Sequence, residues 1–230
     1  PLAYSLDHCG PLSWSVEDSA LTMQVIAGYD PLDPASANVA VPDFVSPLGQ
    51  GIAGLRIGYA RRFFIENPAL TGEVTAALDA AAQQLGALGA TVEEVDLPPF
   101  EQFDACCRTI LFSEAYALHE TDIKTRPHAY GRYAYQHLIS GAVLSAADYV
   151  QAQRLRRELT SALNDGVLTR FDALLSPNAL GTASAFADFG PDAGRWLGML
   201  TGPFNVTGSP ALAVPIGFAA NGLPLSAQIV

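Results

Sequence analysis

Apolar side chains recur every three or four residues in several segments of this 230-residue chain, as in helices that bury one face. The clearest such segment spans residues 68–88. Asn67 is expected to cap this helix, Pro68 to be its first residue, and Gly89 to end it in the left-handed conformation. The apolar positions of this predicted helix are Leu70, Val74, Leu78, Ala81, Leu85 and Leu88.

Two serines mark further helix starts. Ser15 and Ser145 are each followed by an aspartate three residues later, which is the pattern of a capping box. Helices are therefore expected over residues 15–28 and 145–167. Two more helical stretches are expected within residues 102–139.

Short apolar runs bounded by glycine or proline predict strands. A strand, the 68–88 helix and a second strand follow one another, which predicts a βαβ crossover and parallel pairing. The last two strands are expected to be joined by a turn. The expected fold class is therefore α/β, with a mixed, partly parallel sheet covered by helices, in one unit over residues 1–230. The predicted strands are residues 54–59, 91–97, 171–175, 211–218 and 225–230.

The charge balance restricts the class of partner. The chain has 23 acidic and 12 basic residues, for a net charge of −11. Nucleic acid is not expected as a direct partner, because neutralising phosphates requires a basic face. No apolar run reaches the length of about 18 residues that a membrane-spanning helix needs, so no membrane association is expected.

Candidate chemistry within the chain is sparse. Cys9, Cys106 and Cys107 are odd in number and two are adjacent, which favours reduced thiols and a cytoplasmic location. The histidines lack metal-ligand spacing, and no phosphate loop or dinucleotide fingerprint is present. We therefore expect no metal and no cofactor. Lys124 lies in a polar run and is interpreted as solvated, so the residues alone predict no catalytic set.

Five segments in the same order nevertheless resemble the amidase signature family. In that family an S-x-x-L-D-x-x-G-P segment follows the catalytic signature and leads into a helix and a G-x-D-P-x-D-P loop. Residues 6–12 have the sequence Leu-Asp-His-Cys-Gly-Pro-Leu. One departure is Trp14, which stands where many members carry an arginine. The resembling segments are residues 6–34, 54–58, 172–177, 204–211 and 222–230.

The resemblance implies a mechanism whose catalytic residues lie outside this chain. Members use a serine nucleophile, a second serine preceded by a cis peptide, and a neutral lysine. All three precede the L-D-x-x-G-P element and would lie upstream of Pro1. The chain is thus expected to be the C-terminal portion of a single amidase-signature domain, over residues 1–230, and to be inactive alone.

What remains is expected to form the wall of the substrate pocket. In the family, loops at the ends of the C-terminal strands face the nucleophile. The resemblance therefore points to Asn178, Thr201, Phe204 and Asn205 as substrate-binding candidates. The alternative is that Asn178 only completes a turn and that Phe204 belongs to the core.

Three functions remain open at this point. The first is part of an amidohydrolase acting on small or aryl amides. The second is the A subunit of a tRNA-dependent amidotransferase, which releases ammonia from glutamine and leaves tRNA contact to a partner. The third is a non-catalytic α/β scaffold or a relic fragment. Because both ends of the sequence are expected to be cut, an exposed sheet edge predicts a homodimer or another association.

Overall fold

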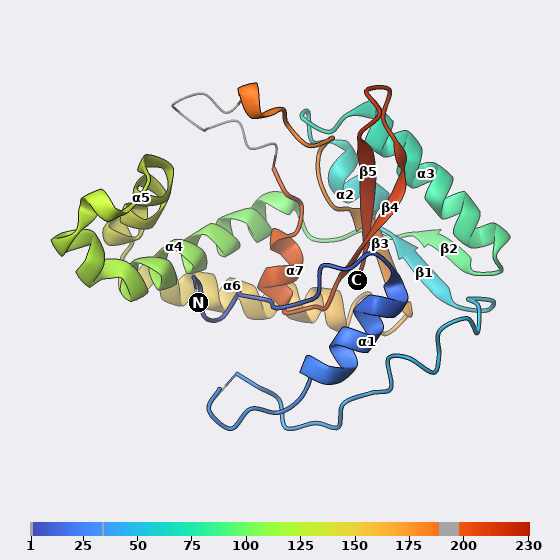
Figure 1. Cartoon of the computed structure of the whole chain (residues 1–230), viewed down its shortest axis with the longest axis horizontal. Helices are drawn as coiled ribbons and strands as arrows, with labels where there is room; N and C mark the ends of the chain where they lie inside the picture. Colours follow the sequence, from blue (N-terminus) through green and yellow to red (C-terminus); the bar gives the residue numbers. More distant parts are fainter. Residues whose placement is uncertain (1, 34, 189–197) are drawn as a thin grey trace.

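The computed structural model describes residues 2–33, 35–188 and 198–230 and is built around one five-stranded sheet (Figure 1). The strand order is β2-β1-β3-β5-β4. Strand β1 pairs in parallel with both β2 and β3, whereas β5 pairs antiparallel with β3 and β4. The predicted mixed, partly parallel sheet is therefore confirmed. The strands are β1 (Arg56–Tyr59), β2 (Thr91–Glu94), β3 (Ala173–Pro177), β4 (Leu212–Phe218) and β5 (Pro224–Ile229).

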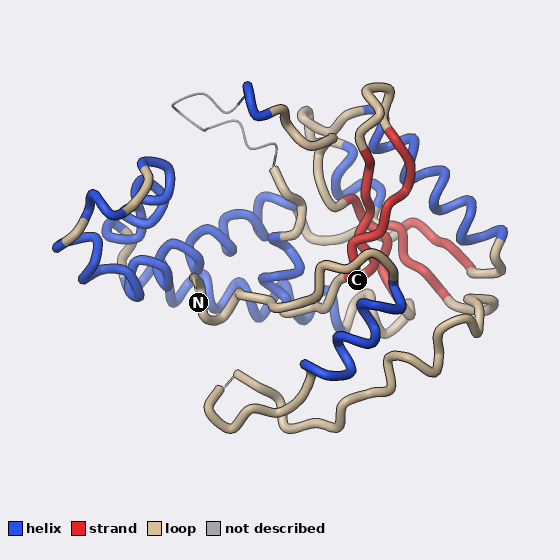
Figure 2. The backbone as a smooth tube through the Cα atoms, viewed as in Figure 1, coloured by secondary structure: helices blue, strands red, loops and turns tan. Residues whose placement is uncertain are grey.

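Helices α4, α5 and α6 extend away from the sheet, which lies at one side of the molecule, whereas α2 and α3 lie beside the strands (Figure 1 and Figure 2). Helices α4 and α6 pack against each other, and α5 lies at the end farthest from the strands. In the described part of the chain, no helix is long and apolar enough to cross a membrane. The α-helices are α1 (Val16–Ile26), α2 (Arg61–Ile65), α3 (Gly72–Ala87), α4 (Phe100–Thr125), α5 (Arg132–Ile139), α6 (Ala146–Asn164) and α7 (Gly202–Thr207), and the 3₁₀ segments are η1 (Pro127–Ala129), η2 (Ser140–Val143) and η3 (Phe186–Asp188).

Three predicted helix ends are confirmed by their local hydrogen bonds and dihedral angles. Helix α1 follows Ser15, whose Oγ accepts a hydrogen bond from the Asp18 N–H at 3.1 Å. Helix α6 begins with the predicted capping box between Ser145 and Asp148. Helix α3 ends before Gly89, which has the left-handed φ of +99°. Residues within one turn of each boundary account for these helix ends.

The predicted start of α3 is wrong by four residues. The helix begins at Gly72, because the Asn67 side chain accepts a hydrogen bond from the Ala69 N–H at 3.0 Å and forms a turn instead of a cap. Thr71 is extended and donates its N–H to the Leu180 carbonyl at 2.9 Å. This tertiary bond holds the chain out of helical conformation until Gly72.

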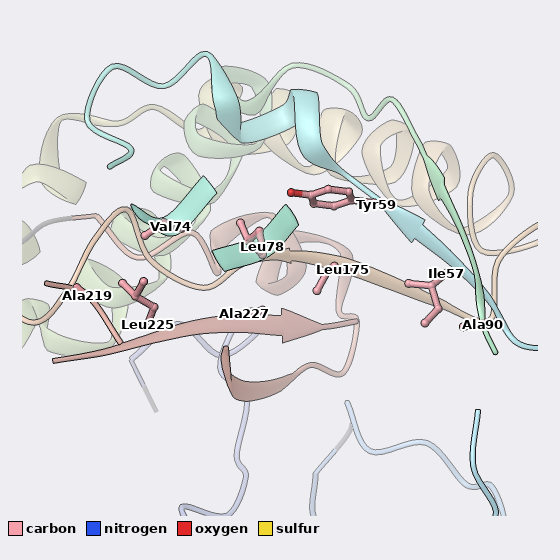
Figure 3. Close-up of a cluster of buried hydrophobic side chains, with 9 residues drawn as sticks. All are labelled: Ile57, Tyr59, Val74, Leu78, Ala90, Leu175, Ala219, Leu225 and Ala227. Carbon is pink, nitrogen blue, oxygen red and sulfur yellow. The ribbon is translucent and has the colours of Figure 1, made fainter. Parts of the chain in front are cut away.

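Hydrophobic clusters cover both faces of the sheet. On one face, Val74 and Leu78 of α3 pack over Ile57 and Leu175 (Figure 3). Successive strand residues point to opposite faces. Leu174 accordingly belongs to a second cluster, which also contains residues from the end of α6, the loop before β3, and α7. The sheet is thus held between α3 and the α6–α7 layer.

Helix α1 differs from the other helices because most of its apolar side chains are uncovered. Ala20 is its only buried residue, and Val25 is 83% exposed. Leu12 and Trp14, just before the helix, are fully exposed. Strand β4 forms one edge of the sheet, and most of its residues are exposed. The described residues therefore leave an apolar surface uncovered on the α1 segment.

Glycine is required where η2 packs on α4. A Cβ atom at Gly141 would overlap the Phe112 carbonyl oxygen and lie 2.5 Å from the Tyr116 Cβ. We expect Gly141→Ala to lower the free energy of unfolding by about 1–3 kcal/mol, because the two segments must separate to admit the methyl group. Chemical denaturation measures this difference.

The matched control is Gly72→Ala in α3, where a Cβ atom would meet no atom within 4 Å. This change should leave stability unchanged or slightly raised, since alanine favours helix more than glycine does. If Gly141→Ala were as stable as the unchanged protein, the packing described for η2 would be incorrect.

Candidate functional site

The carboxyl ends of β1, β2 and β3 meet at one edge of the sheet, because the three strands are parallel. Ligands of open α/β sheets commonly bind at this edge. Strand β3 includes Ser176 and Pro177, so the prediction that it stops before them is wrong. Asn178 follows, and its side-chain Nδ2 donates to Ser226 Oγ of β5 at 3.2 Å. Antiparallel pairing with β5 therefore extends β3 to Pro177, next to the candidate site.

A second segment joins the end of β3 at this point. The Leu200 N–H donates to the Asn178 carbonyl at 3.0 Å, and Ala179 and Met199 form an antiparallel bridge. Thr201, which follows Leu200, is partly exposed and immediately precedes α7. The structure therefore brings together the two segments that carry the predicted residues Asn178 and Thr201.

The buried side chain of Gln228 fixes this junction. Gln228 is 2% exposed, and its Nε2 donates to the Pro177 carbonyl at 2.8 Å and to the Leu200 carbonyl at 3.0 Å. One amide thus ties β5 to the end of β3 and to the segment before α7. Sequence reasoning missed this role, although a glutamine in a largely apolar predicted strand was an available signal. Its register partner Ser176 is fully buried, and its hydroxyl has no hydrogen-bond partner within the described residues.

The other two predicted residues lie on α7 but face different surroundings. Phe204 is 3% exposed and packs in the cluster that contains Leu174 and Leu163. Its side chain therefore supports α7 from the core side. Asn205 donates from Nδ2 to the Leu6 carbonyl at 2.9 Å, so it contacts the N-terminal segment.

The N-terminal segment is held in place by a half-buried polar network. The Ser5 N–H and Oγ donate to the two carboxylate oxygens of Glu114 on α4, at 2.8 and 2.7 Å. Arg156 of α6 donates to the Ser5 carbonyl and to the Val206 carbonyl, each at 2.7 Å. Tyr149 also donates to Glu114, and burial together with this carboxylate raises the pKa of its hydroxyl. Residues 2–8 are thereby fixed against α4, α6 and α7.

Two of the cysteines and the lysine have pKa shifts that oppose a role as nucleophile or neutral base. Burial raises the pKa of the Cys106 thiol to about 11 and also raises that of Cys107, so neither is a thiolate at neutral pH. Lys124 pairs with Glu120 at 2.6 Å, which raises the lysine pKa and keeps it charged. No group of three or more His, Cys, Asp or Glu in the described part of the chain is placed to hold a metal ion.

The contribution of the Gln228 junction to the stability of the protein can be measured. We expect Gln228→Leu to lower the free energy of unfolding by about 2–3 kcal/mol, because the buried Pro177 and Leu200 carbonyls lose their donor. Urea denaturation followed by circular dichroism measures this effect. As a control, Gln151→Leu on the exposed face of α6 should change stability by no more than about 0.5 kcal/mol. Equal effects of the two changes would argue against the junction.

Comparisons with a family model and with curated relatives indicate the same family for this chain. The model of the Amidase family matches residues 1–230. An amidase of Pseudomonas putida is 38% identical over 233 residues, which cover 96% of this chain and 49% of that protein. The A subunit of the glutamyl-tRNA(Gln) amidotransferase of Synechococcus sp. (strain WH7803) is 35% identical over 254 residues, which cover 99% of this chain and 52% of that protein. The chain spans about half the length of these curated relatives.

Solved structures show the same similarity in three dimensions. An inhibitor-bound vestigial protein complex, said to reveal the origins of an s-triazine catabolic enzyme, matches with a TM-score of 0.88 and 33% identity, over 100% of this chain and 50% of that one. A bacterial aryl acylamidase of the amidase signature family matches with a TM-score of 0.77 and 28% identity, over 96% and 48%. This chain therefore belongs to the amidase signature family.

Proposed function

We propose that this chain forms the substrate-facing wall of an amidohydrolase that cleaves carboxylic amides. The observation that carries the proposal is the Gln228 junction at the carboxyl ends of parallel strands, in a chain that matches the Amidase family throughout. The junction holds Asn178 and Thr201 at the edge of the sheet where ligands of such folds bind.

The catalytic triad is proposed to lie in a preceding half of the same fold. There a serine would attack the amide carbonyl carbon, while a neutral lysine receives the serine proton through a second serine preceded by a cis peptide. The amine would leave with that proton, and water would hydrolyse the acyl-enzyme. Backbone N–H groups of a glycine-rich loop would stabilise the negatively charged oxygen. The length of the relatives, about twice that of this chain, supports such a half.

The uncovered surface of the α1 segment supports the same proposal. Leu12 and Trp14 are fully exposed, and Val25 is largely exposed. Burying one side chain of this size contributes about 2 kcal/mol, so a covering element would be strongly favoured. The exposed edge strand β4 offers a further contact, either to that element or to a second copy of the chain.

Asn178 and Thr201 are the proposed contacts with the substrate. Within the described residues, the Asn178 side chain donates from Nδ2 to Ser226, whereas its Oδ1 accepts no hydrogen bond. This oxygen is available to accept from the N–H of an amide substrate. Phe204 would support the pocket wall from the hydrophobic core. Asn205 would fix the N-terminal segment that leads to the catalytic half.

The experiment compares this chain with the full-length gene product. The 230-residue chain should not hydrolyse p-nitroacetanilide or a panel of simple primary amides, and the longer product should. In the longer product, Asn178→Ala should lower kcat/KM about tenfold, mainly by raising KM, because it removes one substrate hydrogen bond. Asn164→Ala, an exposed residue at the end of α6, is the control and should leave both constants unchanged. Turnover by the 230-residue chain that is lost when one of its own serines is changed would overturn the proposal.

The second candidate is the A subunit of a tRNA-dependent amidotransferase, supported by the 35% identity to such a protein. That function requires release of ammonia from glutamine for a partner. Measuring glutaminase and simple amidase activity side by side in the full-length product separates the two. Hydrolysis of simple amides at a kcat/KM at least tenfold above that for glutamine is expected for the amidohydrolase, and the reverse order would favour the amidotransferase.

A further inference from the structure

Arg156 of α6 joins two segments that lie far apart in the sequence. Its Nη2 donates to the Ser5 carbonyl at 2.7 Å and its Nη1 to the Ser5 Oγ at 3.0 Å, whereas its Nε donates to the Val206 carbonyl at 2.7 Å. Ser5 precedes Arg156 by 151 residues, and Val206 follows it by 50. Hydrogen bonds from a charged donor are shorter and stronger than neutral ones. One guanidinium group therefore fixes the N-terminal segment relative to α7.

The positive charge of Arg156 is connected to a carboxylate through Ser5. The Ser5 Oγ accepts from Arg156 and donates to Glu114 Oε1 at 2.7 Å, while the Ser5 N–H donates to Glu114 Oε2 at 2.8 Å. Both charged side chains are half-buried. Removing Arg156 would leave the Ser5 and Val206 carbonyls without this donor, which is costly for groups shielded from water.

The opposite end of α7 is fixed by a different side chain. The Gln228 amide donates to the Leu200 carbonyl, and Thr201 follows as the residue before the helix. Helix α7 has six residues, so it is only about 9 Å long. It packs against α4 and α6 between these two fixed points (Figure 1). A displacement of α7 at Val206 would therefore shift Thr201 as well.

Apolar packing at the same junction does not replace these hydrogen bonds. Leu6 and Val206 belong to one buried cluster, which also contains Ile110. Such contacts favour burial but are not directional. The directional contacts are the Arg156 bonds and a bond from the Asn205 Nδ2 to the Leu6 carbonyl at 2.9 Å. These bonds determine how the N-terminal segment is aligned with α7.

We propose that Arg156 is a positioning residue for amide cleavage. It holds α7, which carries the pocket-wall residue Thr201, in a fixed position relative to the N-terminal segment. This role rests on the proposed function, in which that segment leads to the half that supplies the nucleophile. A misplacement of about 1 Å between reacting groups can slow a reaction about a hundredfold. Arg156 thus acts on the rate without touching the substrate.

The first test measures amide hydrogen exchange in the 230-residue chain by mass spectrometry. Arg156→Met removes every donor but keeps a long apolar side chain. It should raise exchange at least tenfold both in residues 2–8 and in α7, and leave exchange in α3 unchanged. Arg157→Met makes the same change at the next residue, which is exposed and donates no hydrogen bond in the described part of the chain, and should raise exchange in neither segment.

The second test uses the full-length gene product. Arg156→Met should lower kcat/KM for p-nitroacetanilide at least tenfold, whereas the rate of serine labelling by a small fluorophosphonate should fall less than threefold. The probe reacts with the nucleophile and needs little contact with the pocket wall, so it reports whether the triad itself is intact. Arg157→Met should leave both rates unchanged. Arg156→Lys keeps the charge but loses the forked geometry, so it should give smaller changes of the same kind, and it replaces Arg156→Met if that variant does not fold.

Three results would overturn the proposal. Faster exchange in only one of the two segments, or in neither, would show that Arg156 does not couple them. Equal losses of amide hydrolysis and of labelling would show that Arg156 only maintains the fold. If the unchanged full-length product cleaved no amide, the proposed function would fail and the role in catalysis with it, and the exchange data would still show whether Arg156 couples the segments.

Discussion

The candidate site depends on one buried amide. Gln228 lies in β5, yet its two N–H bonds end on the last residue of β3 and on the residue before Thr201. A side chain that is 2% exposed satisfies two backbone carbonyls there, which would otherwise remain buried without donors. Removing the amide would free two loop segments at once. The positions of Asn178 and Thr201 are thus a consequence of the core and not of the loops themselves.

A second polar cluster extends this order to the N-terminal segment. Ser5 is held by Glu114 from α4 and by Arg156 from α6, while Asn205 holds Leu6. Helix α1, which follows, lacks comparable support and leaves its apolar residues exposed. Hydrogen bonds therefore fix the N-terminal segment against α4, α6 and α7, next to the surface on which we propose that a catalytic half rests. This contrast supports the proposed arrangement of two halves. The hydrogen-bonded segments would form the pocket wall, and the exposed apolar surface of α1 would contact the catalytic half.

The sequence predicted elements whose determinants are local. The caps at Ser15 and Ser145 and the turn at Gly89 each involve residues within one turn of chain. The prediction failed at the start of α3, where a bond between Thr71 and a distant carbonyl overrides the local signal. The sequence also did not identify the partner of Gln228, because Leu200 lies 28 residues away. Family resemblance supplied the predicted site residues, and the structure brings together the segments that carry Asn178 and Thr201.

The most direct test of the account is to locate the reactive serine. A fluorophosphonate probe, which labels activated serines, is applied to the full-length gene product, and mass spectrometry identifies the modified peptide. The account predicts a single labelled serine outside residues 1–230, and loss of labelling when a simple amide substrate is present in excess. A labelled serine within residues 1–230 would contradict it, because this chain would then carry the nucleophile and not the wall of the pocket.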